Sequence, residues 1–320
     1  MPSPFLRFRI NRHRRLAWTG SGVAIGLSLL GLMLCSLLAD PTKTLGPPLL
    51  PGLDFTGGTQ IQLERRCQPS CDPVNGPQIQ ESITRIDLPR DGESYLPNLG
   101  STSVQVLDQG STILLRMPAL SPEQSSTVVS TMAEEFGPLN SSATSVDTIG
   151  PTLGAQLLRS SVISLLVSFA AIAAYITFRY SGIFAVLALV CLAHDVLIVS
   201  GVFAWLGLLR GIEVDTLFAV SLITVAGYSI NDTVVVYDRI REQSKALADL
   251  PFSDQVDVAV DATLTRSLYT SFTTLLPLLG LIFFGGASLF WFAVALSIGI
   301  AVGSWSSIGL APTLLSAARR

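Results

Sequence analysis

At the centre of the chain stands Gly227-Tyr228-Ser229-Ile230-Asn231-Asp232-Thr233-Val234-Val235-Val236-Tyr237-Asp238-Arg239, which places an Asn-Asp pair inside an apolar run otherwise suited to span a bilayer. A carboxylate at such a depth costs about 2.5–3.5 kcal/mol on insertion scales, so it normally faces a bundle interior or a wet path. On a helix, Asp232 shares one face with Ser221, Tyr228 and Ser229. Asn231 and Ser229 fit interhelical hydrogen bonding as well as they fit a functional role, whereas the ionisable Asp232 favours function.

The composition is that of an integral membrane protein. Of the 320 residues, 49% are hydrophobic and only 13% are charged, against about 25% charged residues in an ordinary soluble domain. The net charge of −3 is small, and the sequence lacks a basic tract interleaved with aromatic residues. We therefore expect a membrane protein that has no nucleic-acid partner.

Six apolar runs each approach or exceed the roughly 20 residues that a membrane-spanning helix needs. They cover residues 16–39, 160–178, 183–209, 214–237, 267–284 and 289–312. The first run is far longer than the apolar core of a signal peptide, which has about 7–15 residues, so we interpret it as a retained span. The five later runs form a transmembrane region over residues 159–315.

Small residues predict close helix packing in two of these spans, because Gly, Ala and Ser let helix backbones approach each other. In the first span we expect the contact at Gly22 and Gly26. In the last span a small residue recurs every fourth position, at Ala295, Gly299, Gly303 and Ser307.

Positive charges predict the orientation, because Lys and Arg concentrate in cytoplasmic loops. Five arginines lie within residues 1–15, which assigns that segment to the cytoplasm. Alternation then places loop 238–266 and residues 316–320, both with arginines, on the same side, and residues 40–158 outside. Both termini are therefore expected to be cytoplasmic.

Residues 40–158 are polar, and their pattern predicts a small α+β domain. Strands fit residues 60–63, 103–107, 112–117 and 143–149. One helix fits residues 78–86, and a second starts at Ser121-Pro122 and stops at Gly137-Pro138. The order β-α-β-β-α-β is the ferredoxin-like arrangement. Residues 67–77 fit an inserted loop.

The 4 cysteines fall into two groups. Cys35 and Cys191 lie in apolar runs and are most simply small core residues. Cys67 and Cys71 lie close together in the polar region, where a metal site would need further Cys or His ligands that the sequence does not provide. We therefore expect no metal, and a local disulfide between these two if the region lies outside the cytoplasm.

The cytoplasmic loop contains a helical pattern of apolar and small residues. The pattern comprises Val256, Ala259, Val260, Thr263 and Leu264. It predicts an interfacial helix, and Ser253 after Pro251 predicts its N-terminal cap.

Other polar groups lie in or beside the spans. His194 and Asp195 are adjacent in the third span. Neighbours on a helix point about 100° apart, so we expect these two residues not to bond each other and to hold separate partners. For both residues we favour a structural role over proton handling. Arg266, at the mouth of the fifth span, either snorkels to the interface or has a functional partner.

Signatures of common enzymes are missing from the sequence. Intramembrane metalloproteases need H-E-x-x-H, but the chain has only His13 and His194. Neither G-x-S-x-G nor the P-loop G-x-x-x-x-G-K-[ST] occurs. Tyr237-Asp238 is half of an aspartyl protease signature without its Gly-x-Gly-Asp partner. We expect no enzymatic activity.

Several stretches along the chain together match one known family in order. They are Gly52-Leu53-Asp54-Phe55-Thr56-Gly57-Gly58-Thr59, Ile149-Gly150-Pro151-Thr152-Leu153-Gly154, Ala193-His194-Asp195, residues 227–242 and Thr265-Arg266-Ser267. Together they resemble the SecD/SecF family of bacterial protein translocase subunits, within the resistance-nodulation-division (RND)-like transporters. The resemblance covers nearly the whole chain. It implies an all-α six-span bundle of RND type with one extracytoplasmic ferredoxin-like α+β domain.

The resemblance also implies a function. A SecF-like accessory subunit would work with SecD beside the SecYEG channel and use the proton-motive force to help export preproteins. Carried onto this chain, Asp232 is the proton-carrying carboxylate and Arg266 its charge partner. Protons are the coupling ion, and no cofactor is expected. The resemblance also implies the bacterial plasma (inner) membrane as the location, with an internal membrane as the alternative.

Five further intramembrane residues are expected to give polar support to this site: His194, Asp195, Asn231, Tyr228 and Ser229. Two alternative functions stay open. One is a subunit of a proton-driven RND-type exporter of small molecules or lipids, although such exporters generally have duplicated six-span halves in one chain. The other is a membrane scaffold that conducts no protons.

Overall fold

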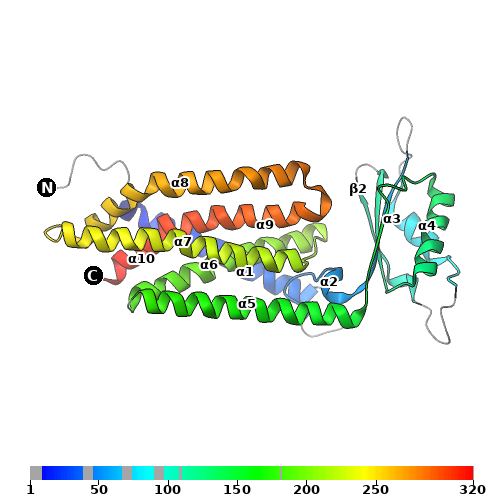
Figure 1. Ribbon diagram of the computed structural model, residues 1–320, viewed down its shortest axis with the longest axis horizontal. Helices are drawn as coiled ribbons and strands as arrows, with labels where there is room; N and C mark the ends of the chain where they lie inside the picture. Colours follow the sequence, from blue (N-terminus) through cyan, green and yellow to red (C-terminus); the bar gives the residue numbers. More distant parts are fainter. Residues whose placement is uncertain are drawn as a thin grey trace. The chain divides into compact units, whose positions relative to one another are not determined.

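The computed structural model describes residues 9–38, 46–66, 74–89, 97–107, 110–180 and 182–319. The chain divides into two compact units (Figure 1). The outer unit comprises residues 51–160, and the membrane unit combines residues 1–50 with 161–320. Cys67 and Cys71, for which a disulfide is predicted, lie outside the described residues.

The outer unit is built on a four-stranded sheet in the order β2-β3-β1-β4, antiparallel throughout. Its strands are β1 (Gly58–Glu64), β2 (Ser103–Leu107), β3 (Thr112–Met117) and β4 (Ser145–Ile149). The helices α3 (Gly76–Thr84) and α4 (Pro122–Phe136) follow β1 and β3 in the chain. Short helical turns, α2 (Leu53–Thr56) and η2 (Leu99–Ser101), precede β1 and β2. The predicted ferredoxin-like arrangement is confirmed.

Alternation along the strands gives this sheet one buried face, which α3 and α4 cover (Figure 1). Ile61 and Leu63 of β1 are fully buried, whereas Gln60 and Gln62 between them are partly exposed. The core combines residues from β1 and β3 with residues from both helices: Ile61, Leu63, Ile113, Leu115, Ile79, Ile83, Val128 and Met132. The apolar residues that alternate along the strands therefore pack against the apolar face of each helix, where such residues recur about every 3.6 positions.

Both helices begin with a capping box, in which the cap side chain and the third helical residue exchange hydrogen bonds. Asn75 and Gln78 form the box of α3, and Ser121 and Gln124 form that of α4. The α4 helix starts and stops as predicted, and it ends at Gly137, whose φ is 97°. The α3 helix starts and stops two residues earlier than predicted, because Asn75 rather than a later residue caps it.

Two adjacent glycines form the entry into β1, where the backbone requires them. Gly57 has φ 69° and Gly58 has φ 130°, both values that residues with side chains rarely adopt. A Cβ on Gly58 would lie 2.7 Å from the carbonyl oxygen of Met117, and one on Gly57 would lie 2.8 Å from Cα of Pro151. This turn therefore packs directly on β3 and on the first turn of the helix that begins at Pro151.

The described residues contain six helices long and apolar enough to cross a membrane. The first is α1 (Arg14–Leu38), preceded by the 3₁₀ turn η1 (Ile10–His13). Then follow α5 (Pro151–Arg179), α6 (Ile183–Arg210), α7 (Thr216–Ala246) and α8 (Phe252–Phe284). The last span consists of α9 (Gly286–Trp305), the π-helical segment η4 (Ser306–Leu310) and α10 (Ala311–Ala318).

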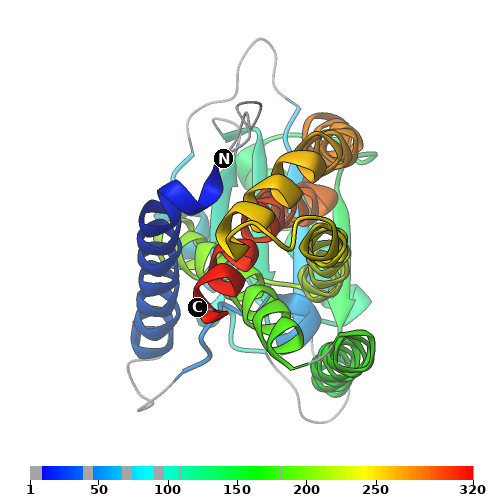
Figure 2. The same ribbon diagram turned by 90° about the vertical axis from the view of Figure 1, so that its left-hand side faces the viewer.

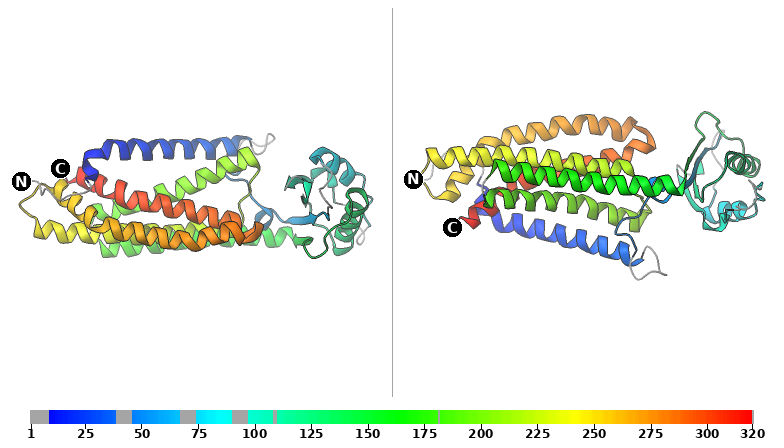
Figure 3. Two further views of the ribbon diagram at one scale, coloured as in Figure 1. Left: turned by 90° about the horizontal axis from the view of Figure 1, so that it is seen from above. Right: turned by 60° about the horizontal axis from the view of Figure 1, so that its bottom comes forward.

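In the membrane unit, α1 packs along α6, and α7, α8 and α9 pack against one another (Figure 2, Figure 3). The α6 helix also contacts α7 and α9 and so connects the two groups. By contrast, only 6% of the apolar window of α5 is buried within the protein. The bundle core is therefore made mainly by α6, α7 and the last span.

The predicted close contact at Gly22 and Gly26 is not made by another helix of this chain. Both glycines are exposed, and no atom of the described residues lies within 4 Å of a Cβ built on either. The close approach between α1 and α6 occurs one face away, where a Cβ on Gly201 would lie 2.2 Å from Cβ of Ser28. A glycine therefore does allow close packing here, but it belongs to α6.

The predicted stripe of small residues in the last span is confirmed as a packing surface against α7. Ala295 and Ser307 are fully buried. A Cβ on Gly299 would lie 2.1 Å from Cγ2 of Val225, and one on Gly303 would lie 3.2 Å from Cβ of Ser229. The two helices therefore approach so closely that a larger residue at Gly299 could not be accommodated without movement.

The loop predicted over residues 238–266 is shorter than expected. Residues 239–246 continue α7, and the helical pattern at Val256–Leu264 belongs to α8, which runs without a break into the span. The prediction of a separate interfacial helix is therefore wrong. Ser253 does not cap it either, because the helix begins at Phe252 and its N-cap, Pro251, forms no side-chain cap.

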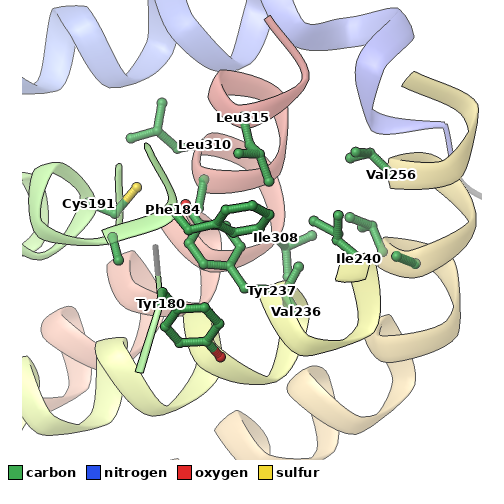
Figure 4. Packing of buried hydrophobic residues seen from close by; sticks show 14 of the residues in the cluster. Tyr180, Phe184, Cys191, Val236, Tyr237, Ile240, Val256, Ile308, Leu310 and Leu315 are labelled. Atoms are coloured by element: carbon green, nitrogen blue, oxygen red, sulfur yellow. The ribbon is translucent and has the colours of Figure 1, made fainter. Parts of the chain in front are cut away.

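An aromatic cluster fills the core between the start of α6 and the second half of α7 (Figure 4). Tyr237 is fully buried, and its ring lies edge-on to Phe184 at 5.2 Å and to Tyr180 at 6.0 Å between centroids. Cys191 belongs to the same cluster, and both it and Cys35 are buried free thiols, as predicted for core residues.

Candidate functional site

Asp232 lies on the buried face of α7, with only 4% of its surface exposed. Ser267 of α8 donates a hydrogen bond to Oδ1 at 3.3 Å, and Ser307 of η4 donates one to Oδ2 at 3.2 Å. The carboxyl group therefore lies where α7, α8 and the π-helical segment meet. Its hydrogen-bond partners are two neutral hydroxyls from two other helices.

Arg266 immediately precedes Ser267 on α8, so the chain brings a guanidinium next to this site. The side chain is exposed and interacts electrostatically with Asp232. Within the described part of the chain, no salt bridge joins the two residues. Arg266 is thus close enough to act on the carboxyl charge without holding it in a fixed ion pair.

A second hydrogen-bonded group continues the polar face of α7. The hydroxyl of Tyr228 donates to Oγ of Ser271 on α8 at 2.9 Å. Ser271 and Ser304 of α9 lie 2.5 Å apart between their hydroxyl oxygens. Because Ser271 is one helical turn from Ser267, these polar contacts link α7, α8 and α9 one turn away from Asp232.

His194 and Asp195 form the next polar group, on α6. Nδ1 of His194 lies 2.8 Å from Oδ1 of Asp195, so the expectation that these neighbours do not bond each other is wrong. Adjacent Cα–Cβ bonds do point apart on a helix, but rotation of both side chains into the same buried space brings the two polar ends together. Asp195 also has separate partners, because its Oδ2 accepts from Ser229 of α7 at 2.5 Å and from Ser306 of η4 at 2.7 Å.

Asn231 does not join these groups. It is exposed on α7, and its side chain makes no hydrogen bond within the described part of the chain. The helical rotation of about 100° between neighbours turns it away from the face that carries Asp232. The structure therefore brings together His194, Asp195, Tyr228, Ser229 and Asp232, with Arg266 at the margin, and leaves Asn231 outside.

The residues that sequence reasoning missed are serines. Ser267 and Ser306 contact the carboxyl groups, Ser271 contacts the hydroxyl of Tyr228, and Ser304 contacts Ser271. Ser307, which contacts Asp232, was assigned only to packing. A serine in a spanning helix usually bonds its own backbone or packs closely, so it gives little signal by itself. The available signal was clustering, because three of four consecutive residues from Ser304 to Ser307 are serines in an apolar run.

Taken together, the site is a set of buried carboxyl groups held by hydroxyls. A hydroxyl can donate to an ionised carboxylate, and it can accept from a protonated one. The same side chains can therefore satisfy either protonation state without large movement. Across the described residues, no group of three or more His, Cys, Asp or Glu side chains is arranged to hold a metal ion.

Comparison with known families gives two matches. The family described as "Protein export membrane protein SecD/SecF, C-terminal" matches residues 128–320. The "SecD/SecF GG Motif" matches residues 45–68, which include the Gly57-Gly58 turn.

Curated relatives cover most of the chain. Protein translocase subunit SecF of Prochlorococcus marinus is 49% identical over 97% of this chain and 94% of its own length. The Synechocystis subunit of the same name is 41% identical over 90% of this chain and 88% of its own. Protein translocase subunit SecDF of Thermus thermophilus is 36% identical over 83% of this chain, but over only 34% of its own length.

A solved structure has the same fold. The crystal structure of SecDF from Thermus thermophilus, described as a translocon-associated membrane protein, superimposes with a TM-score of 0.79 at 30% sequence identity. The match covers 100% of this chain and 39% of that one. A second crystal structure of SecDF, in a super-membrane-facing form, gives a TM-score of 0.60.

Proposed function

We propose, from the premise that this chain belongs to the SecD/SecF family as a protein translocase subunit of SecF type, that it couples the proton-motive force to preprotein export. It is a multi-pass membrane protein of a transport family. The proposal assigns it no chemical reaction and no cofactor, since protons are the coupling ion. It places the protein in the inner membrane with both termini in the cytoplasm, on the strength of the arginine distribution.

The relatives support a SecD-type partner. SecDF of Thermus thermophilus and SecDF of Brucella abortus are longer chains, of which this chain covers 34% and 36%. Their names combine SecD with SecF, and the remaining length is what a separate SecD-type subunit would supply here. The proposal extends this assembly to the SecYEG channel and a translocating preprotein.

The observation that carries the proposal is the setting of Asp232. It is a buried carboxyl group in a membrane-spanning helix, contacted by hydroxyls from two other helices. An ionisable residue in such a position normally marks an ion or proton path. Moving one charge through the membrane potential yields about 2.3 kcal/mol per 100 mV, comparable to the roughly 1–3 kcal/mol of a typical allosteric coupling.

Arg266 gives the proton cycle a switch. Because it interacts with Asp232 without a fixed ion pair, a modest movement of α8 relative to α7 changes the field at the carboxyl group. Approach of the guanidinium favours the ionised form, and retreat favours the protonated form. The Ser267 contact on the same helix would change with it. Proton binding and helix position are in this way linked, and each biases the other.

The test is Asp232→Asn, which keeps the size of the side chain and removes its ability to ionise. We expect the proton-motive-force-dependent part of preprotein export, measured in membrane vesicles, to be lost. Asp249→Asn, an exposed change in the loop between α7 and α8, is the matched control and should export normally. Asp232→Glu, which retains a carboxyl group, should recover part of the activity.

The same experiment separates the alternatives. Co-purification of Asp232→Asn with a SecD-type subunit and the SecYEG channel should equal that of the wild type, so that loss of export cannot be assigned to failed assembly. Normal proton-dependent export by this variant would refute the proposed role of Asp232. Assembly with neither partner would instead favour a small-molecule or lipid exporter or a scaffold.

A further inference from the structure

We propose that His194 and Asp195 form a second proton-binding site, coupled to Asp232 through serine hydroxyls. The inference deepens the proposed function, because it rests on Asp232 as the proton-carrying group. It concerns the buried titratable pair that the proposed cycle at Asp232 and Arg266 leaves unused.

The first observation is an imidazole with one nitrogen unpartnered. His194 is 3% exposed, and its Nδ1 contacts Asp195, which is 0% exposed. Its Nε2 is buried and has no hydrogen-bond partner in the part of the chain that the structure describes. When Nδ1–H donates to the carboxylate, Nε2 keeps a free lone pair. A buried polar atom without a partner is uncommon and calls for a reason, and a proton-accepting nitrogen supplies one.

The surroundings of the pair contain few other titratable groups. The helices packed against α6 are α1, α7, α9, η4 and α10. Between Leu16 and Leu38 α1 carries only Cys35, and α9, η4 and α10 carry none. On α6 itself the nearest is Cys191, and on the membrane-embedded part of α7 they are Tyr228, Asp232 and Tyr237. Asp232 is thus the acidic group on a neighbouring helix with which this pair shares a hydrogen-bonded network.

Two segments connect the two carboxyl groups, α7 through Ser229 and η4 through Ser306 and Ser307. Along α7, Ser229 donates to Oδ2 of Asp195 at 2.5 Å, and Asp232 follows three residues later on the same helix face. Along η4, Ser306 donates to Oδ2 of Asp195 at 2.7 Å, while the next residue, Ser307, donates to Oδ2 of Asp232 at 3.2 Å. A movement of either segment therefore acts on both carboxyl groups.

The connection along η4 has two possible hydrogen-bond arrangements. A serine hydroxyl carries one proton, yet each of these two has two acceptors within reach. Ser306 lies 3.1 Å from the carbonyl oxygen of Gly303, and Ser307 lies 3.0 Å from that of Ser304. When a carboxyl group takes up a proton, its serine can turn to the backbone carbonyl and accept the new O–H.

The backbone of this segment is itself unusual. Ser306–Leu310 is π-helical, and the N–H of Ala311 donates to the carbonyl of Ser306. Single π turns within α-helices occur frequently at functional sites. Here the π turn presents consecutive serines to carboxyl groups on two different helices, which gives protonation at one site a direct mechanical connection to the other.

The test uses the fact that the chain has only 2 histidines. In the full-length His13→Gln variant, reconstituted in lipid nanodiscs with isotope-labelled histidine, all imidazole NMR signals come from His194. His13 is an exposed residue at the end of η1, so its loss should not affect the bundle. We expect the signals of His194 to report protonation with a measurable midpoint as pH is varied.

Coupling is tested by adding Asp232→Asn. Removing a negative charge linked to the imidazole should move the midpoint of His194 to lower pH, by roughly 0.7–2 pH units if the coupling has the five- to 150-fold size typical of linked sites. Ser306→Ala and Ser307→Ala each break the η4 connection, so in either variant the shift caused by Asp232→Asn should shrink. Ser297→Ala and Ser316→Ala are matched controls, because their hydroxyls lie on the same span, are buried and have no hydrogen-bond partner among the described residues. They should leave the shift unchanged.

The outcomes are distinct from those of the export test. An imidazole that keeps one neutral form over the pH range in which the protein is folded overturns the inference, and so does a midpoint that Asp232→Asn does not move. If export needs Asp232 but His194 does not titrate, or titrates with a midpoint that Asp232→Asn leaves unchanged, the proposed second proton-binding site is refuted and the proposed function stands. If His194 titrates in concert with Asp232 while export ignores Asp232→Asn, the proton sites are coupled and the proposed function fails.

Discussion

Gly299 sets how closely the last span can approach α7. A Cβ at this position would lie 2.1 Å from Cγ2 and 2.7 Å from Cγ1 of Val225. No real contact is that short, so a side chain here forces the two helices apart. The same approach brings Ser306 and Ser307 within hydrogen-bonding distance of Asp195 and Asp232. The glycine at this position therefore permits the helix spacing at which both of these hydrogen bonds form.

Gly299→Ala should destabilise the bundle by about 1–3 kcal/mol, the usual cost of overpacking a close-packed interior. The measurement is thermal unfolding of the purified protein in detergent, followed by circular dichroism. Gly280→Ala on α8 is the control, because no atom of the described residues lies within 4 Å of its Cβ position and alanine favours the helix. Equal stability of the two variants would show that the α7–α9 contact is less tight than described.

At the scale of elements, the N-terminal turn η1 is fastened to the start of α8. The backbone N–H of Asn11 donates to Oδ1 of Asp257 at 3.0 Å, and its side-chain Nδ2 donates to the same oxygen at 2.9 Å. The Nδ2 group also donates to the carbonyl of Ser253 at 3.0 Å. The sequence predicted only a cytoplasmic segment here, so this connection comes from the structure alone.

Asp257→Ala should release η1 from α8. Trypsin added to the cytoplasmic side should then cleave after Arg12 several-fold faster than in the wild type, since local unfolding controls access to the bond. The control is Asp254→Ala, in the same first turn of α8 but outside the Asn11 contact. Identical cleavage rates in the two variants would contradict the fastening role.

Sequence patterns predicted the elements far better than the contacts between side chains. Strand alternation and capping residues such as Ser121 are local signals, so the ferredoxin-like unit was predicted nearly element by element. Asp232 was found because a charge in an apolar run is conspicuous. The serines that hold it were not, because the same residue type commonly serves packing, and which hydroxyl reaches which carboxyl depends on how the helices associate. His194 and Asp195 were misjudged because backbone rotation alone does not determine side-chain rotation.

At the scale of the whole molecule, the long apolar helices identify a membrane protein. The assignment of each loop to one side of the membrane depends on the positions of the basic residues. Arg179, Arg239, Arg241 and Lys245 all lie at one end of their spans, and Arg179 and Asp238 form an ion pair there at 2.9 Å. Basic residues next to spans remain on the cytoplasmic side. The loop between α7 and α8 is therefore expected inside the cell and the ferredoxin-like unit outside.

Single cysteines can test this orientation in a chain whose four native cysteines are replaced by alanine. Ser142→Cys, exposed in the outer unit, should react in intact cells with a membrane-impermeant maleimide. Asp249→Cys, exposed between α7 and α8, should react only after the inner membrane is permeabilised. The reverse labelling pattern would invert the proposed topology.

The unequal anchoring of α5 affects how force can travel along it. Its first turn is clasped by the Gly57-Gly58 turn, since a Cβ on Gly154 would lie 2.8 Å from the backbone nitrogen of Gly57. Further along, its apolar window is only 6% buried. Within this chain, α5 is therefore held closely at its first turn and has few contacts with the other described spans along the rest of its length. A pull on the Gly57-Gly58 turn would act directly on a helix that those spans restrain little.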